Sequence, residues 1–238
     1  IVTLYFVPLA GFSMFGQFEF SLVVISYLLL VIPLALTLGG ASSSSPWGAI
    51  GAQREAELTL AYEVPQILGI FSLAIIANTL SITDLINYQN REVPFIVLNP
   101  FAAVAVFVAL LGKLQIKPFD ISEAEVEIIA GPATEYSGKL LGILEIMKTL
   151  LMFLVPALFI DLFLGGGIIG TITGNNQTLS ALAFVVEIAI IVFIAALVHV
   201  FSPRFRVDQA FRWFSKFPLI LGLIAVGWAY AIKLLGVI

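Results

Sequence analysis

The chain has 238 residues and a net charge of −4; 61% of its residues are hydrophobic, 11% are charged, and its mean hydropathy is +1.11. Soluble domains are typically about 45–50% apolar and about 25% charged, so this composition excludes a soluble globular protein. The chain contains no cysteine and one histidine, which excludes thiolate-held iron–sulfur clusters, cysteine-rich zinc sites and disulfide bonds among its own residues. We therefore expect an integral membrane protein without a metal site, whose redox centres, if any, belong to partners.

Apolar runs of about 20 residues, the length that a helix needs to cross a bilayer, recur along the chain. Residues 1–18 are interrupted by Pro8, Gly11 and Gly16, which predicts the end of a helix followed by a turn, with the preceding part of the chain missing. The segments predicted to cross the membrane after it are about 20–38, 54–80, 95–112, 137–164, 178–201 and 217–232. The sequence thus predicts an all-α, polytopic membrane helical bundle of about seven segments, a single transmembrane domain over residues 1–238.

Three predicted loops, at about residues 39–54, 113–136 and 202–216, fall on the same side of the membrane if the segments alternate in direction. The basic residues gather on this side: Arg54, Lys113, Lys117, Lys139, Arg204, Arg206, Arg212 and Lys216. The other side holds only Arg91 and Lys233. Because basic loops stay in the cytoplasm, we expect a multi-pass protein of the plasma membrane with these three loops in the cytoplasm.

Glu145, Lys148 and Glu187 lie inside predicted spans, where a charge costs roughly 2.5–3.5 kcal/mol on insertion scales. Glu145 and Lys148 are three positions apart, so they share one helical face and can neutralise each other. A structural ion pair and a proton-coupling pair both remain open for them. Glu187 has no partner on its own helix, so we expect it to pair with another helix, to face water or to be protonated.

Three acids lie near the start of the segment 54–80. Glu55 is typical of a solvated helix end, where acids favour the positive end of the helix dipole. Glu63 lies deeper and precedes Pro65, which frees a backbone carbonyl and often bends a helix, so we interpret it as a proton-coupling residue. Glu57, six positions before Glu63, points in another direction and remains a further candidate.

The predicted loop 113–136 is unusually acidic for a connection between membrane helices. Its carboxylates alternate with apolar residues, which indicates a segment folded against protein rather than a solvated loop. Like charges disfavour one another's ionisation, so such a cluster takes up and releases protons when a nearby charge changes. The candidate proton-coupling acids of this loop are Asp120, Glu123, Glu125, Glu127 and Glu135.

Three stretches resemble the proton-coupling membrane subunit shared by respiratory complex I (subunit 1, or H subunit) and the energy-converting hydrogenases. They are Gly51–Val64 (GAQREAELTLAYEV), Lys117–Gly138 (KPFDISEAEVEIIAGPATEYSG) and Pro203–Gln209 (PRFRVDQ). The resemblance covers nearly the whole chain and keeps the family's motif order. Members of the family have eight membrane helices, which implies that the first one is missing here.

The resemblance implies a subunit that docks a peripheral electron-transfer arm and couples electron transfer to proton or ion translocation, without performing the redox step. It adds the loop acids, Glu63 and Glu145 to an acidic path; Glu57, Lys148 and Glu187 are candidates from the residues alone. It also implies a quinone-like cavity and an interface with the peripheral arm, lined by Arg54, Tyr62, Tyr136, Arg204, Arg206, Asp208 and Gln209.

The loop reads Glu123-Ala124-Glu125 and continues to Gly131-Pro132, which is more similar to the hydrogenase branch and to archaeal sulfur-reducing complexes. The implied partners are subunits resembling hydrogenase large and small subunits, antiporter-like membrane subunits and the lipid bilayer, with no nucleic acid. Iron–sulfur clusters, with nickel–iron or quinone as open alternatives, are expected in or near these partners and none in this chain. Two other functions remain open: a quinone-binding subunit of a NADH, ferredoxin or coenzyme F(420):quinone oxidoreductase, and a stand-alone secondary transporter.

Overall fold

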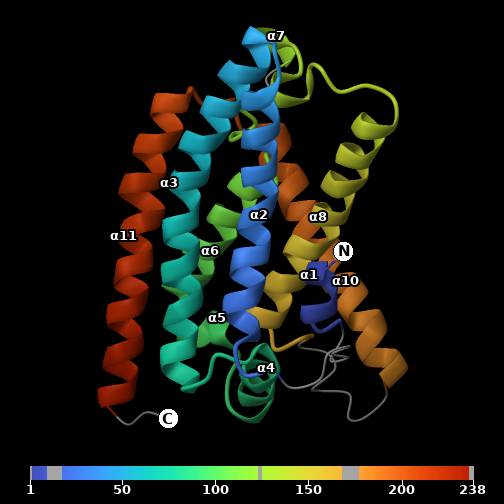
Figure 1. Ribbon diagram of the computed structural model, residues 1–238. Coiled ribbons are helices and arrows are strands. Elements are labelled where there is room, and N and C mark those ends of the chain that lie inside the picture. The colour runs from blue at the N-terminus through green and yellow to red at the C-terminus, as the bar shows by residue number, and fades with distance from the viewer. Residues whose placement is uncertain (1, 10–17, 123–124, 168–176, 236–238) are drawn as a thin grey trace.

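The computed structural model describes residues 2–9, 18–122, 125–167 and 177–235, which form an all-α bundle (Figure 1). The short helical elements are α1 (Val2–Phe6), α4 (Ile82–Arg91), α5 (Phe95–Leu98), α7 (Glu125–Ile128) and the 3-10 turn η1 (Gly131–Ala133). The longer ones are α2 (Ser21–Ser42), α3 (Pro46–Ala77), α6 (Pro100–Lys113), α8 (Lys139–Phe163), α10 (Gln177–Phe201) and α11 (Val207–Leu234).

Among the described residues, five helices are long and apolar enough to cross a membrane: α2, α3, α8, α10 and α11. The shorter helix α6 is also apolar, but it falls below the length of these five. The helix α1 is a five-residue piece. The predicted polytopic helical membrane bundle is therefore confirmed.

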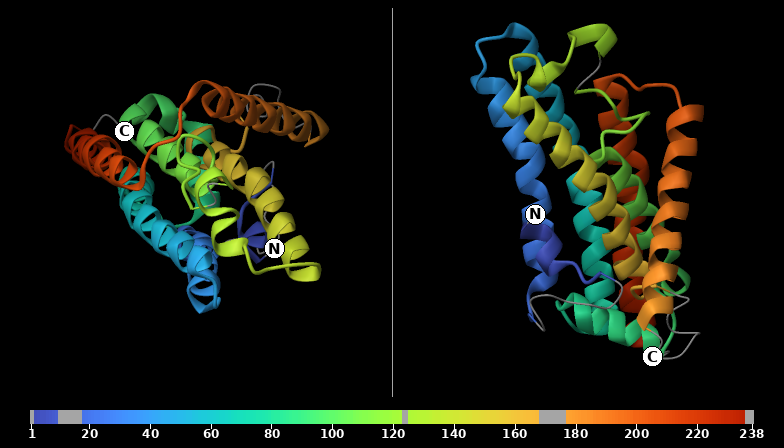
Figure 2. Two further views of the ribbon diagram at one scale, coloured as in Figure 1. Left: turned by 90° about the horizontal axis from the view of Figure 1, so that it is seen from above. Right: turned by 90° about the vertical axis from the view of Figure 1, so that its right-hand side faces the viewer.

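Helix α3 lies at the centre of one layer, between α2 and α11, and packs on α6 behind it (Figures 1 and 2). Helices α8 and α10 lie beside each other on the other side of α6. One end of the bundle, the loop end, carries the turn 43–45, the acidic segment 114–138 and the connection 202–206. The opposite end carries α4, whose apolar face is buried through Ile82, Leu85 and Ile86.

Two of the predicted loops are shorter than expected. The prediction of a loop at 39–54 is wrong in extent, because α2 continues to Ser42 and α3 begins at Pro46. Proline suits the first turn of a helix, and a Cβ on Gly40 would lie 2.9 Å from the carbonyl oxygen of Gly48, so the glycines allow the two helices to meet closely. The loop predicted at 202–216 also ends early, because α11 begins at Val207.

An aromatic cluster fixes the start of the acidic segment against the bundle. The ring centroid of Phe119 lies 4.6 Å from that of Phe214 on α11 and 5.5 Å from that of Trp213. Phe214 in turn meets the ring of Tyr62 on α3 at 6.3 Å. Aromatic pairs at these separations stabilise beyond the burial of their area, so the residues that follow Phe119 are held close to α3 and α11.

Candidate functional site

A stripe of buried polar side chains runs along one face of α3. Its members follow one another at spacings of four, three, one and three positions, which keeps them on one side of a helix. From the first to the last, the stripe extends about 16 Å at a rise of about 1.5 Å per residue. The stripe consists of Glu55, Thr59, Tyr62, Glu63 and Gln66, all buried. Such a series of polar groups inside an apolar bundle needs partners on neighbouring helices.

Glu63 finds its partner on α6. The Nζ of Lys113, the last residue of α6, lies 2.7 Å from Oε1 of Glu63, and only 1% and 9% of the two side chains are exposed. Lys113 also lies over the ring of Tyr62, with Nζ 5.7 Å from the ring centroid, a favourable cation–π arrangement. Two opposite charges buried together need each other, because removal of either leaves an uncompensated charge away from water.

Glu55 is buried rather than solvated, so its interpretation as a solvated helix end is wrong. It is 1% exposed, and Nε2 of Gln115 donates a hydrogen bond of 2.7 Å to its Oε2. The physical reason is that α3 begins nine residues earlier, at Pro46, and the chain that leaves α6 lies over this part of the helix. Glu55 therefore belongs to the same buried set as Glu63.

These polar groups border a cavity of about 270 Å³ between α2, α3, α8 and the end of α6. Glu55, Lys113 and Gln115 line it together with Lys148 of α8. Apolar side chains, among them Ile32 of α2, complete the lining. The cavity is therefore amphiphilic, with charged groups on one part of its wall and aliphatic groups on the rest.

Ion pairs hold the acidic segment to the rest of the loop end. Nη1 of Arg54 on α3 donates to Oε2 of Glu127 on α7 at 2.6 Å, and Arg204 pairs with Asp120. The hydrogen bond from Arg54 holds the pKa of Glu127 below its usual value, and the positive charges of Arg204 and Arg206 add to this effect. Sequence stretches far apart in the chain are thereby joined at one end of the bundle.

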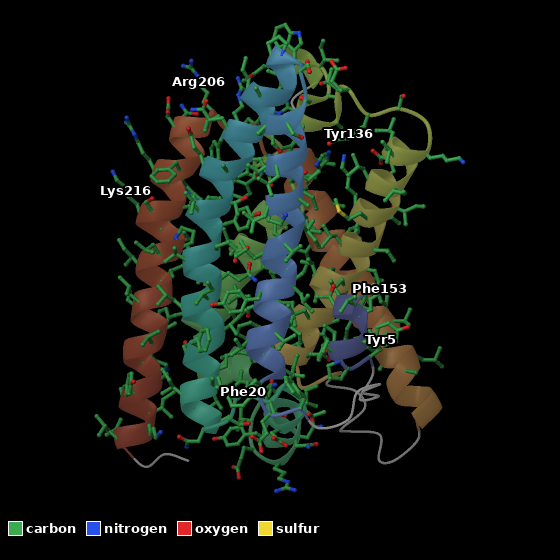
Figure 3. The ribbon with its side chains drawn as sticks, viewed as in Figure 1. Tyr5, Phe20, Tyr136, Phe153, Arg206 and Lys216 are labelled. Atoms are coloured by element: carbon green, nitrogen blue, oxygen red, sulfur yellow. The ribbon has the colours of Figure 1, made fainter. Side chains whose placement is uncertain are left out.

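A second cavity, of about 320 Å³, lies among these groups at the loop end. Arg54, Glu127, Arg204, Arg206 and Asp208 contribute its charged lining. Figure 3 shows Arg206 near the start of α11 at this end of the bundle. The two cavities differ in character, since three arginines border this one and aliphatic side chains border much of the first.

Other predicted residues lie at the loop end but outside the buried set. Glu135 is exposed, and Tyr136 is half-buried, close to Gly39 of α2 (Figure 3). Asp208 and Gln209 are exposed in the first turn of α11. Glu57 is half-buried and accepts a hydrogen bond of 3.2 Å from Gln53. Glu123 lies outside the described residues, and Glu125 is the first residue of α7.

The candidates inside predicted spans divide into one buried acid and one exposed pair. Glu187 is buried in α10. Glu145 and Lys148 form an ion pair of 3.5 Å, but 63% of the Glu145 side chain is exposed on a face of α8 that the described chain leaves uncovered. The expected pairing is therefore present without the expected burial, since no helix of the described chain covers this face.

The polar residues that the sequence did not mark as candidates include the buried Lys113, Gln66 and Asp161 and the half-buried Gln115. Lys113 was counted only as a basic residue of a loop, and Gln115 and Gln66 carry no charge that marks them. Asp161, buried in the last turn of α8, does carry a signal, because an acid within a predicted span marks a functional candidate. In the described part of the chain, no group of three His, Asp or Glu side chains is arranged to hold a metal ion.

Comparison with known proteins finds relatives along more than nine tenths of the chain. A sequence model of the family described as NADH dehydrogenase matches residues 1–230. The H subunit of the NADH-quinone oxidoreductase of Dehalococcoides mccartyi is 30% identical over 222 residues, which cover 92% of this chain and 61% of the relative. The H subunit of the F(420)H(2) dehydrogenase of Methanosarcina mazei is 29% identical, with 92% and 63% covered. The chain thus spans less than two thirds of these relatives.

A solved structure matches the fold. It is a chain of the membrane-bound sulfane sulfur reductase, described as an archaeal respiratory membrane complex. The two chains superpose with a TM-score of 0.86 and 31% sequence identity, and the match covers 96% of this chain and 75% of the other.

Proposed function

Because the chain belongs to the NADH dehydrogenase family, we propose that it is the membrane subunit that docks a peripheral electron-transfer arm and couples electron transfer to proton translocation. Its relatives are H subunits of membrane oxidoreductases, and the chain that it superposes on belongs to a sulfur-reducing complex. The observation that carries the proposal is the buried Glu63–Lys113 pair, which joins the middle of α3 to the end of α6.

A charge change at the loop end reaches this pair through the neighbouring polar groups. In a low-dielectric interior, charges interact far more strongly than in water. A negative charge arriving from the peripheral arm competes for the arginines that hold Asp120 and Glu127. The negative charge of the freed carboxylates changes the electrostatic potential at Glu55, Glu63 and Lys113. Glu63 then takes up a proton and releases it later.

The proton path continues from Glu63 into the membrane past Gln66. It is 0% exposed, and neither Nε2 nor Oε1 has a hydrogen-bond partner among the described residues. Buried polar atoms of this kind are commonly satisfied by internal water. An internal water molecule bound to the Gln66 amide would extend the path by about one helical turn beyond Glu63.

The assignment of partners follows the distribution of charged and apolar surface. The arginine-bordered cavity at the loop end suits the peripheral arm, whose subunits resemble hydrogenase large and small subunits and carry the iron–sulfur clusters. The uncovered face of α8, with Glu145 and Lys148, suits an antiporter-like membrane neighbour. The loop end then lies in the cytoplasm. The electron acceptor is then sulfur or protons, as in the sulfur-reductase and hydrogenase branch.

The test replaces Glu63 by Gln in the whole complex, reconstituted into vesicles. We expect ion pumping per electron to fall by about tenfold or more, a typical loss for a removed acid–base group, while electron transfer to the acceptor continues. Glu19→Gln, which alters an exposed acid away from the site, is the matched control. Normal pumping by the Glu63→Gln complex would refute the proposal.

The amphiphilic cavity favours a second candidate function, the binding of a quinone. A quinone has a polar head and an aliphatic tail, and this cavity offers Lys113 and Lys148 together with apolar walls. Leu36→Trp, which fills the cavity from α2, should then block quinone reduction. If the purified complex reduces no quinone, or if this variant leaves quinone reduction unchanged, the second candidate fails and the first is unaffected.

A further inference from the structure

Asp161 is a buried acid that the proposed pathway does not use. It lies in the last turn of α8, at the end of the bundle opposite the loop end, and it is 0% exposed. Neither Oδ1 nor Oδ2 has a hydrogen-bond partner among the described residues. The surrounding part of α8 is apolar and buried, including Leu158, Leu162 and Phe163.

A second buried carboxylate approaches the same place from α10. After α8, three glycines with positive φ turn the chain back, among them Gly166 and Gly167. A Cβ on Gly166 would lie 3.6 Å from Oδ1 of Asp161, and one on Gly167 would lie 3.9 Å from Oε2 of Glu187. One oxygen of each carboxyl group therefore lies near one of two consecutive glycines.

No positively charged side chain of the described helices α4 and α5 forms an ion pair with the Asp161 carboxyl group. Gln89 of α4 donates from Nε2 to the backbone carbonyl of Asp161 at 3.1 Å, and its Oε1 accepts from the backbone of Phe95 at 3.2 Å. The amide of Gln89 is thus used on main-chain groups. The other titratable or charged groups of α4 are Asp84, Tyr88 and Arg91, followed by Glu92. None of the described basic residues forms an ion pair with Asp161.

The buried polar path of α3 reaches the same half of the bundle. Ser72, one helical turn and a half beyond Gln66, is fully buried and accepts a hydrogen bond of 3.2 Å from Nδ2 of Asn99. Asn99 precedes α6, whose other end carries Lys113. Buried polar groups therefore occur along α3 as far as the half of the bundle in which Asp161 lies.

We propose that Asp161, with Glu187 beside it, forms a proton-binding site in the half of the bundle opposite the acidic segment. A carboxyl group sealed away from water and without a counter-charge holds a proton, because ionisation there is strongly unfavourable. The site extends the proposed proton path and therefore rests on the proposed function for its role in turnover.

Infrared spectroscopy of the purified complex tests the protonation without any need for turnover. The spectrum of each variant is subtracted from that of the wild type. We expect a carbonyl band of a protonated carboxyl group at neutral pH in the wild type and in the Glu19→Gln control, and its loss in Asp161→Asn. An unchanged set of such bands in Asp161→Asn would mean that Asp161 is ionised and would overturn the proposal. A band that disappears when sodium is added at constant pH would overturn it in favour of a cation site.

Pumping by reconstituted complexes separates this inference from the proposed function. We expect Asp161→Asn and Glu187→Gln each to lower the ions pumped per electron by about tenfold or more, while electron transfer and subunit assembly persist. Normal pumping in both, with loss in Glu63→Gln, would refute the role of Asp161 and leave the proposed function intact. Normal pumping in all three would refute both. Asn is nearly isosteric with Asp, so a purely structural acid would tolerate the exchange.

Discussion

Glu63 and Lys113 form an ion pair in which both side chains are buried. Fifty positions separate them in the chain, and they meet because α3 and α6 pack against each other. Their mutual dependence makes the pair sensitive to one added or removed proton, since either charge alone is costly in an apolar interior. Stability and proton coupling are therefore two consequences of the same contact.

Loss of the lysine alone should destabilise the protein more than loss of both charges. We expect Lys113→Met to lower the stability by about 3–5 kcal/mol, because Glu63 stays buried without its partner. The double variant Lys113→Met/Glu63→Gln should recover most of this loss. Thermal unfolding of the detergent-purified protein measures both, and a double variant no more stable than the single one would contradict the pairing.

The titration of Glu127 gives a prediction at the acidic segment. The pKa of Glu127 is lowered in the folded protein. Its ionised carboxylate therefore stabilises the folded acidic segment above the ordinary carboxyl pKa, and this stabilisation is lost as the pH falls through the lowered pKa. Hydrogen exchange of α7, corrected for the intrinsic effect of pH, should therefore stay slow until the pH falls below the ordinary carboxyl range. In Arg54→Gln, exchange should already be fast at neutral pH; equal protection in both proteins would disprove the role of this ion pair.

At the scale of elements, α3 carries both the buried polar stripe and a close contact with α6. Its buried polar stripe faces the neighbouring helices, and further along the same helix Gly69 allows α6 to approach closely. A Cβ on Gly69 would lie only 2.3 Å from Cγ2 of Val106. The distance between α3 and α6 also sets the distance between Glu63 and Lys113, so this contact bears on the site.

A methyl group at Gly69 should therefore separate the two helices. We expect Gly69→Ala to destabilise the protein by about 1–3 kcal/mol, the usual effect of overpacking, and to weaken pumping along with stability. Val106→Ala removes the clashing methyl groups, so Gly69→Ala/Val106→Ala should be more stable than Gly69→Ala. Chemical denaturation of the purified variants compares the two. If the single and the double variant were equally stable, the clash between residues 69 and 106 would not be the cause of the destabilisation.

At the scale of the molecule, the two ends of the bundle differ. The loop end carries Arg54, Arg204, Arg206 and the acidic segment, while the opposite end is closed by α4 and contains the buried Asp161. Between the ends, many large apolar side chains are exposed on the outer faces of α2, α8, α10 and α11. Such faces suit lipid and neighbouring membrane subunits, in keeping with a subunit of a larger membrane complex.

The absence of native cysteine in the chain allows a direct test of its orientation. Ser44 is exposed in the turn between α2 and α3, and Asn87 is exposed on α4 at the opposite end. Because the basic residues gather at the loop end, an impermeant maleimide should label Ser44→Cys only from the cytoplasmic side. It should label Asn87→Cys only from the other side. Labelling of Ser44→Cys in intact cells would reverse the proposed orientation.

The sequence by itself determined the membrane class, the approximate spans and the family, because apolar composition, run length and motif order are all local properties of the chain. It also marked Glu63, Glu187 and the acidic segment, since acids between or within apolar runs are visible without a fold. Only the tertiary structure decided that Glu63 meets Lys113, that Glu55 is buried and that Glu145 is exposed. The physical reason is that burial and charge pairing depend on which helix faces pack together, and residues distant in the chain decide that.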